Sequence, residues 1–214
     1  MVIESPPRDG FAASRQVVEL DRGHSQEAAE VLTRALLPYP TMRWVCRSER
    51  PGFEDRLRAV YRVAIAMQRA ERQPTLGVLD GERLVAVAIV HDPGRKLTPR
   101  SALAGFLGSV LSPARTTMER GHRYETAIGR ERPRDPHHFL SVIGVCPDEQ
   151  RRGYGHALMD AIHARAARDP RSVGVWLDTC DPDNRSYYES FGYEVCGRCR
   201  TGPLDQWIMF RPAA

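Results

Sequence analysis

Two kinds of hydrophobic pattern take turns along the chain, one with the period of a strand and one with the period of a helix. Short apolar or alternating runs predict strands at residues 16–21, 137–145, 173–180, 193–201 and 206–212, and two more within 75–92. Apolar residues three and four apart predict helices at residues 25–37, 52–73, 101–112, 114–129, 155–168 and 184–192.

Turn residues set the order of these elements. Asp80-Gly81 divides the run at 75–92, and Asp-Gly between apolar runs is a strong hairpin signal. Gly192 is expected to close the helix before it. The order is strand, two helices, hairpin, helical insert, strand, helix, strand, helix and two strands.

That order predicts an α/β protein with a sheet of mixed direction and helices on both faces. Residues 137–180 form a strand–helix–strand unit, which we expect to be a parallel, right-handed crossover. We expect one domain at 15–214, with a helical insert at about 93–136. Residues 1–14 read as a flexible tail.

Composition narrows the function. The 214 residues are 42% hydrophobic, enough for a sizeable core, and carry a net charge of +4. Nucleic-acid binding is disfavoured, because basic and acidic residues are balanced and no basic run has interleaved aromatics. A membrane span is not expected, since no apolar stretch approaches ~20 residues. The first ten residues lack the apolar core of a signal peptide, so we expect a cytoplasmic protein.

The cysteine count is also consistent with a cytoplasmic protein. An odd count of five in a cytoplasmic chain favours free thiols. Cys196 and Cys199 form a single Cys-x-x-Cys, and a structural zinc site needs two further ligands. We therefore expect no metal, and the role of this pair stays open.

A glycine-containing stretch, "QRRGYG" at 150–155, joins the strand at 137–145 to the next helix. The first helical turn carries amide N–H groups without helical partners and a partial positive charge. Glycines let a phosphate approach those donors, and two arginines add charge. The stretch is not a Walker A loop, because no Gly-Lys-Ser/Thr follows, and it lacks the third glycine of a dinucleotide fingerprint. A plain loop-to-helix turn is the alternative interpretation.

A second motif lies downstream in "NRSYYESFGYEV", where Asn184, Tyr188, Gly192 and Tyr193 have a recognisable spacing. Together with Gln-x-x-Gly-x-Gly at 150–155, it resembles the GNAT superfamily of acetyl-CoA-dependent N-acetyltransferases. In that family a pyrophosphate loop lies between the fourth strand and the third helix, and an Asn–Tyr–Gly-Phe pattern follows. Tyr193 stands here in place of the Phe.

The resemblance is close over about 137–195 and is limited to the element order before that. Residues 137–212 are also similar to the branch that contains puromycin N-acetyltransferases. The family likeness implies a mostly antiparallel, splayed sheet. It also implies transfer of an acetyl group from acetyl-CoA to an amine, by direct attack through a tetrahedral intermediate, and our first interpretation of the acceptor is a primary amine of a small molecule.

The likeness also assigns the donor-binding residues. The pantetheine arm is expected to pair with the open edge of the fourth strand, where Gly144 fits a bulge and an N–H near Val145 stabilises the oxyanion. Tyr188 matches the general acid that protonates the departing thiolate. The expected acetyl-CoA contacts are Ile143, Gly144, Val145, Gln150, Arg151, Arg152, Gly153, Tyr154, Gly155, His156 and Asn184. Two of these roles have alternatives, because Tyr188 also suits packing and Asn184 also suits a helix N-cap.

The general base stays open. Ser141 and Phe139 occupy the positions where family members often carry Glu or His, and neither is a base. The remaining candidates are His137, His138, Asp178 or water alone. For His137 the favoured interpretation is a histidine that faces solvent at the start of the strand, rather than a base.

The acceptor is open too. A protein or peptide amine, or a non-catalytic acyl-CoA-binding module, are the alternatives to a small molecule. The loop at 38–52 and the insert at 93–136 are expected to border the acceptor site. Within that loop, Tyr39 and Trp44 suit either an aromatic wall or core packing. The protein is expected to be a monomer or a homodimer.

Overall fold

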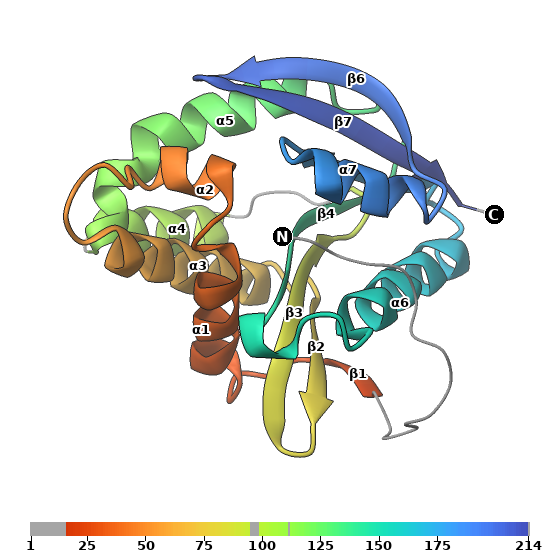
Figure 1. Ribbon diagram of the computed structural model, residues 1–214, viewed down its shortest axis with the longest axis horizontal. Coiled ribbons are helices and arrows are strands. Elements are labelled where there is room, and N and C mark those ends of the chain that lie inside the picture. Colours follow the sequence, from red (N-terminus) through yellow and green to blue (C-terminus); the bar gives the residue numbers. More distant parts are fainter. Residues whose placement is uncertain (1–15, 95–98, 111, 214) are drawn as a thin grey trace.

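The computed structural model describes residues 16–94, 99–110 and 112–213, so the predicted tail at 1–14 lies outside the described residues. Within them, a seven-stranded sheet has the order β1-β2-β3-β4-β5-β7-β6 (Figure 1). The strands are β1 Gln16–Glu19, β2 Thr75–Asp80, β3 Arg83–His91, β4 His138–Val145, β5 Gly174–Thr179, β6 Glu194–Thr201 and β7 Leu204–Pro212.

The helices are α1 Ser25–Leu36, α2 Pro40–Val45, α3 Phe53–Ala70, α4 Pro99–Val110, α5 Met118–Arg130, α6 Tyr154–Arg168 and α7 Pro182–Glu189. This order confirms the predicted α/β class. One helix was not predicted: α2 lies in the segment expected to be a loop. Pro40 occupies its first turn, where a proline is pre-organised for a helix.

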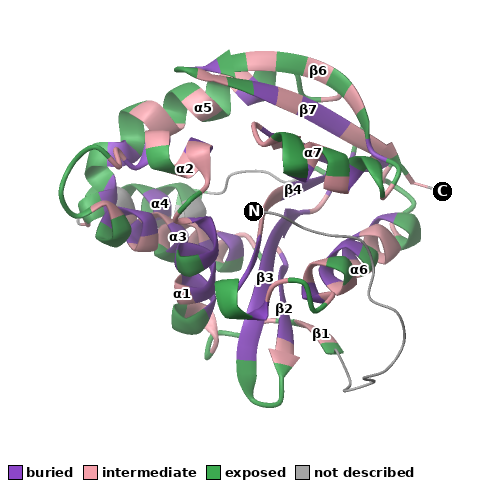
Figure 2. Cartoon of the chain, in the orientation of Figure 1, coloured by how far each residue is buried: buried purple, intermediate pink, exposed green. Residues whose placement is uncertain are grey.

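The sheet is covered on both faces, as predicted. Figure 2 shows β3 buried along nearly its whole length, because one of its faces packs against α1 and α3 and the other against α6. On the α6 side, Leu158 and Ile162 are fully buried among β3 residues such as Ala88. This layered core fixes the position of α6 and of the loop that precedes it.

The sheet opens between β4 and β5. These strands are parallel, as predicted, but pair only at His138–Val175 and Phe139–Trp176. The Phe139 and Trp176 rings lie 4.4 Å apart between centroids and close the joined end. Beyond Phe139 the two strands diverge, which leaves one edge of β4 without a strand partner among the described residues.

A bulge in β4 lies at this divergence. Val142 pairs with Ile89 of β3, whereas Leu140 pairs with the next residue, Val90. Ser141 is therefore the extra residue, and the bulge bends β4 where it leaves β5.

Gly144 does not form the predicted bulge. It pairs regularly with Val87 and lies under α1, where an added Cβ would stand 2.8 Å from the Cβ of Ala35. The absence of a side chain therefore serves the close approach of α1 to β4. Our expectation at this position was wrong about the bulge, although the glycine does allow a close contact.

The insert contributes two helices. α4 packs on α3 through its glycines, since a Cβ on Gly105 would meet Met67 and one on Gly108 would meet Val63. α5 runs beneath β6 (Figure 1) and brings Tyr124 toward β5. Among the helices of the described residues, none has the length and hydrophobicity needed to cross a bilayer.

Candidate active site

The loop between β4 and α6 has the backbone of an anion site. Arg151 takes a left-handed conformation with φ of 62°, and Gly153, the N-cap of α6, has φ of 81°. That conformation favours glycine at 153, because a Cβ is disfavoured there. The first helical hydrogen bond runs from the Ala157 N–H to the Gly153 carbonyl, at 3.0 Å. The amides of residues 154–156 therefore lie in the first turn, where donors have no helical acceptor.

Polar contacts hold this loop in place. The Gln150 side chain donates to the Val145 carbonyl at 3.4 Å. Glu149 is buried between two arginines, with Arg152 at 2.8 Å and Arg83 in close contact. Arg152 remains more than half exposed, so its guanidinium can move to an incoming phosphate.

Three residues at the start of α6 make contacts that the sequence did not reveal. The Tyr154 hydroxyl donates to Asp80 at 3.0 Å, which ties α6 to the β2–β3 hairpin. An added Cβ on Gly155 would stand 3.3 Å from the Tyr187 hydroxyl, so this glycine also admits α7. The exposed His156 ring packs on Phe191, with 4.5 Å between centroids.

A pocket fills the gap between the diverging strands. Its floor comes from Leu140–Ile143 of β4 and from Leu177 and Asp178 of β5. Its walls come from α1, α2, α3, α5 and α7. Its polar lining residues are Tyr39, Tyr61, Tyr124, Ser141, Asp178, Asp181, Asn184 and Tyr188.

Tyr188 lines this pocket from α7 and is only 7% exposed. Burial raises the pKa of its phenol well above the ordinary value, with smaller contributions from Tyr187 and Asp178. Its hydroxyl makes no hydrogen bond to any part of the chain that the structure describes. The phenol is therefore protonated at neutral pH and available as a proton donor.

Asn184 also lines the pocket, and it is not the N-cap of α7. Asp181 caps that helix, accepting from the amides of Asp183 at 2.9 Å and of Asn184 at 3.3 Å. The Asn184 side-chain oxygen is buried and has no partner within residues 16–94, 99–110 and 112–213. A buried acceptor without a donor costs free energy, so this atom suits a ligand N–H.

Asp178 lines the pocket from β5. The hydroxyl of Tyr124 donates to its carboxylate, at 3.0 and 2.9 Å from the two oxygens. Burial raises the pKa of Asp178 to about 7, and the hydrogen bond from Tyr124 opposes that rise. A carboxylate with this pKa can take up a proton near neutral pH. Asp178 was one of the base candidates from the sequence, whereas Tyr124 was missed, because 54 residues separate the two.

The two histidines do not reach the pocket. His137 is 3% exposed; its Nδ1 donates to the Asp135 carbonyl at 2.7 Å and its Nε2 accepts from Arg132 at 3.2 Å. Burial lowers the pKa of His137. The expectation that it faces solvent was therefore wrong.

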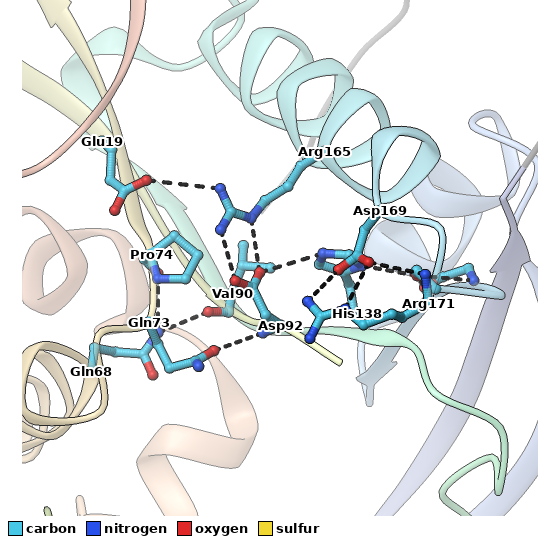
Figure 3. A network of polar contacts seen from close by, with 12 residues as sticks. Glu19, Gln68, Gln73, Pro74, Val90, Asp92, His138, Arg165, Asp169 and Arg171 are labelled. Carbon is cyan, nitrogen blue, oxygen red and sulfur yellow. Dashed lines mark hydrogen bonds and ion pairs between the residues drawn. The ribbon is translucent and has the colours of Figure 1, made fainter. Parts of the chain in front are cut away.

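His138 belongs to a polar network at the joined end of β4 and β5 (Figure 3). Its Nδ1 lies 2.9 Å from the Ser172 hydroxyl, and its Nε2 lies 3.4 Å from Asp92. Asp92 in turn binds Arg165 of α6 through two hydrogen bonds of 2.8 and 2.7 Å. This network is structural, and it leaves Asp178 as the base candidate that lines the pocket.

Of the remaining residues singled out in the sequence, one lines the pocket and the others do not. Tyr39 lines the pocket, as an aromatic wall requires, but Trp44 packs against Gly202 and under the Arg120 guanidinium. Cys196 and Cys199 are free thiols on β6. No group of three metal-ligating side chains occurs within the described ranges.

A comparison with known protein families indicates a class of enzyme for this site. Residues 118–195 match the family model described as an acetyltransferase (GNAT) domain. This part of the chain is therefore similar to GNAT acetyltransferase domains. The matched stretch includes the glycine loop, Asp178 and Tyr188, and it supports an acyltransferase, which confirms the enzyme class predicted from the sequence.

Solved structures show the same fold. An acetyltransferase from Corynebacterium glutamicum, described as histone acetyltransferase HPA2 and related acetyltransferase, is 22% identical, with a TM-score of 0.70 over 94% of this chain and 97% of that one. Arylalkylamine N-acetyltransferase 2 from Aedes aegypti is 10% identical, with a TM-score of 0.62 over 94% and 100%. The ribosomal-protein-S18-alanine N-acetyltransferase from Escherichia coli is 17% identical, with a TM-score of 0.52 over 94% of each chain.

Proposed function

We propose that this protein transfers an acetyl group from acetyl-CoA to the primary amine of a small molecule. The observation that carries the proposal is the pocket that opens where β4 leaves β5. It is lined by the β4 edge and Tyr188, and β4 runs on from it into the glycine loop.

The donor end suits acetyl-CoA. The pyrophosphate would accept hydrogen bonds from the amides at the start of α6, supported by the guanidiniums of Arg151 and Arg152. The pantetheine arm would pair with the β4 edge at Ile143, Gly144 and Val145, which has no β5 partner. These contacts would place the thioester in the pocket.

The reaction then needs one bond made and one broken. The amine nitrogen attacks the thioester carbonyl, and an amide N–H of the β4 edge stabilises the oxyanion of the tetrahedral intermediate. Collapse of the intermediate breaks the C–S bond. Tyr188 donates a proton to the leaving thiolate and regains one as the nitrogen loses its own. No cysteine lines the pocket, which is consistent with direct attack and no acyl-enzyme.

A small acceptor fits the enclosure of the pocket better than a protein does. Side chains from α2, α3, α5 and α7 surround it, including Met42, Tyr61 and Tyr124. A small molecule is also the acceptor expected if residues 137–212 belong with the branch of puromycin N-acetyltransferases, as their sequence pattern predicts. The names of the similar structures include both kinds of acceptor, an arylalkylamine and a ribosomal protein, so the fold alone does not choose.

The test is to incubate the protein with acetyl-CoA and each of a panel of small primary amines, and to detect acetylated products by mass spectrometry. Mass detection is preferable to thiol reagents, because the five free cysteines of the protein would react. We expect acetylated small amines. Acetylation of peptide amines alone would favour the protein acceptor, and acetyl-CoA binding without any transfer would favour the binding module.

A further inference from the structure

We propose that Asp178, positioned by Tyr124, receives the ammonium group of the acceptor, and that the acceptor is a lipophilic primary amine without a carboxylate. This inference rests on the proposed acetyl transfer and adds the class of acceptor to it. Neither the family match nor the sequence motifs assign a role to the pair of Asp178 and Tyr124.

The placement of Asp178 supports the first part. It lies on β5 opposite the β4 edge, at the part of the pocket that the sheet divergence opens. Tyr124 has a single hydroxyl proton, whereas the carboxylate of Asp178 has two oxygens. The carboxylate can therefore accept a hydrogen bond from a further donor. An ammonium group has three donors and a charge of the opposite sign. Among the described residues that line the pocket, no cation pairs with the half-buried carboxylate of Asp178, and an ammonium group of the acceptor would supply that partner.

The charge of the pocket supports the second part. Asp178 and Asp181 both line it, and no lysine or arginine does among the lining residues. A carboxylate on the acceptor would have to lose its hydration beside two acidic groups with no cation to offset the cost. Amino acids and other amines with a nearby carboxylate are therefore disfavoured.

The rest of the lining defines the body of the acceptor. The lining includes the apolar side chains of Leu36, Met42 and Val142 and the rings of Tyr39 and Tyr61. Such surfaces gain free energy by burying apolar or aromatic groups. A compact hydrophobic amine matches them, whereas a polar polyamine or an aminoglycoside would lose hydration of its hydroxyl or ammonium groups against these apolar and aromatic surfaces.

The proton steps balance. The anionic carboxylate of Asp178 takes one proton from the ammonium and releases it to solvent, which produces the neutral amine that can attack. The second proton leaves the nitrogen after the C–N bond forms, and it replaces the one that Tyr188 gives to the thiolate. The net reaction converts an ammonium and a thioester into an amide, a thiol and one released proton.

Tyr124 acts through Asp178 and is a positioning residue. Its hydrogen bond favours the charged carboxylate and so lowers the pKa of Asp178 against the effect of burial. The other titratable groups that act on the carboxylate or feel its charge are Glu125 of α5, Tyr39, Tyr188 of α7 and Cys199 of β6. Because Tyr124 comes from the insert, the insert takes part in setting the pH range of the reaction.

The acceptor class is tested with three matched amines: 2-phenylethylamine, phenylalaninamide and phenylalanine. They share the aromatic body, and only the last carries a carboxylate. We expect kcat/KM for phenylalanine to be lower than for the other two by about 100-fold or more, as expected when a charge is buried without a partner. Equal or better use of phenylalanine, or no acetylation of any of the three by protein that binds acetyl-CoA, would overturn the acceptor assignment.

Two variants test the roles of the pair. Asp178→Asn is expected to lower kcat/KM near neutral pH by about 100-fold or more, the usual range for a lost general base. Tyr124→Phe is expected to move the acidic limb of the kcat/KM profile to higher pH. A purely structural role for Tyr124 would lower activity without moving that limb, and full activity of Asp178→Asn would refute its role.

Acetyl-CoA affinity, measured by calorimetry, separates this inference from the one on which it rests. Both variants are expected to bind acetyl-CoA as the parent does, because neither residue lies at the loop before α6. Failure of the parent protein to bind acetyl-CoA would remove the proposed function itself. Normal binding and turnover combined with the wrong acceptor preference would contradict only the inference drawn from Asp178 and Tyr124.

Discussion

The donor end and the acceptor pocket of this site are encoded in different ways. The phosphate-binding part of the proposed donor end is a continuous stretch, residues 145–156, whose geometry follows from local backbone conformations such as that of Gly153. The acceptor pocket is assembled from seven elements or their flanks, and its central pair, Tyr124 and Asp178, is 54 residues apart.

This difference explains why the two ends carry different information. A pyrophosphate is the same in every acetyl-CoA, and a helix N-terminus with a glycine N-cap is a sufficient receptor for it. An acceptor differs from one enzyme to the next, so its recognition depends on side chains that the fold brings together. Tyr188 lies where the two ends meet, and changes there are expected to have the largest effect.

The first prediction removes the proton donor at the junction. Tyr188→Phe is expected to lower kcat by about 10²- to 10⁴-fold, the range for loss of a general acid, with unchanged acetyl-CoA affinity. Steady-state kinetics and calorimetry measure the two quantities. Tyr187→Phe is the matched control, since the Tyr187 hydroxyl is buried with no partner in the described chain, and it should keep its activity. Full turnover by Tyr188→Phe would refute the acid.

The second prediction concerns the contact that supports the pocket from behind. Gly144→Ala places a methyl group 2.8 Å from the Cβ of Ala35, so we expect the free energy of unfolding to fall by about 1–3 kcal/mol, the range for overpacking. Chemical denaturation measures it. Adding Ala35→Gly should cost less in the Gly144→Ala background than in the parent. Strict additivity of the two changes would contradict the close approach.

The third prediction tests the buried acceptor on α7. Asn184→Ala removes the side-chain oxygen that has no partner in the described residues, so stability should change little. Acetyl-CoA affinity should fall about tenfold, since a net hydrogen bond is worth ~1 kcal/mol. A loss of stability with unchanged affinity would show instead that Asn184 serves the fold.

The smallest effect concerns the helix that carries the donor end. His163 of α6 lies 3.1 Å from the Tyr193 hydroxyl, and burial lowers its pKa from 6.5 to about 4. The unfolded chain therefore takes up this proton first as the pH falls. Stability should decrease between about pH 6.5 and pH 4, by on the order of 1 kcal/mol for a half-buried ring. His163→Gln should show a shallower decrease in denaturation midpoints across the same range.

The contrast between the two ends also accounts for what the sequence predicted. Hydrophobic periodicity and turn residues were sufficient for the element order and for the hairpin at Asp80-Gly81. They missed α2, because a six-residue helix has too few turns to show a period. The glycine loop was predictable because its signal is local.

The features that the sequence did not predict depend on tertiary contacts. Nothing in the sequence distinguishes Tyr124 from any other tyrosine, and only the packing of α5 under β6 brings it to Asp178. The assignment of His137 to solvent failed for the same reason, since its burial comes from Trp176 and Arg132 around it. Gly144 was recognised as a close-contact position, but the partner turned out to be α1.

The most direct test is calorimetric titration of acetyl-CoA into the parent protein, Gly153→Glu and Gly94→Glu. Both glycines have positive φ, and a Cβ at Gly94 meets nothing within 4 Å, so the control shares the backbone strain and the added charge. We predict micromolar affinity for the parent and for Gly94→Glu, and at least ~100-fold weaker binding to Gly153→Glu, because its carboxylate blocks and repels the pyrophosphate. No binding to the parent, or equal binding to both variants, would contradict the account.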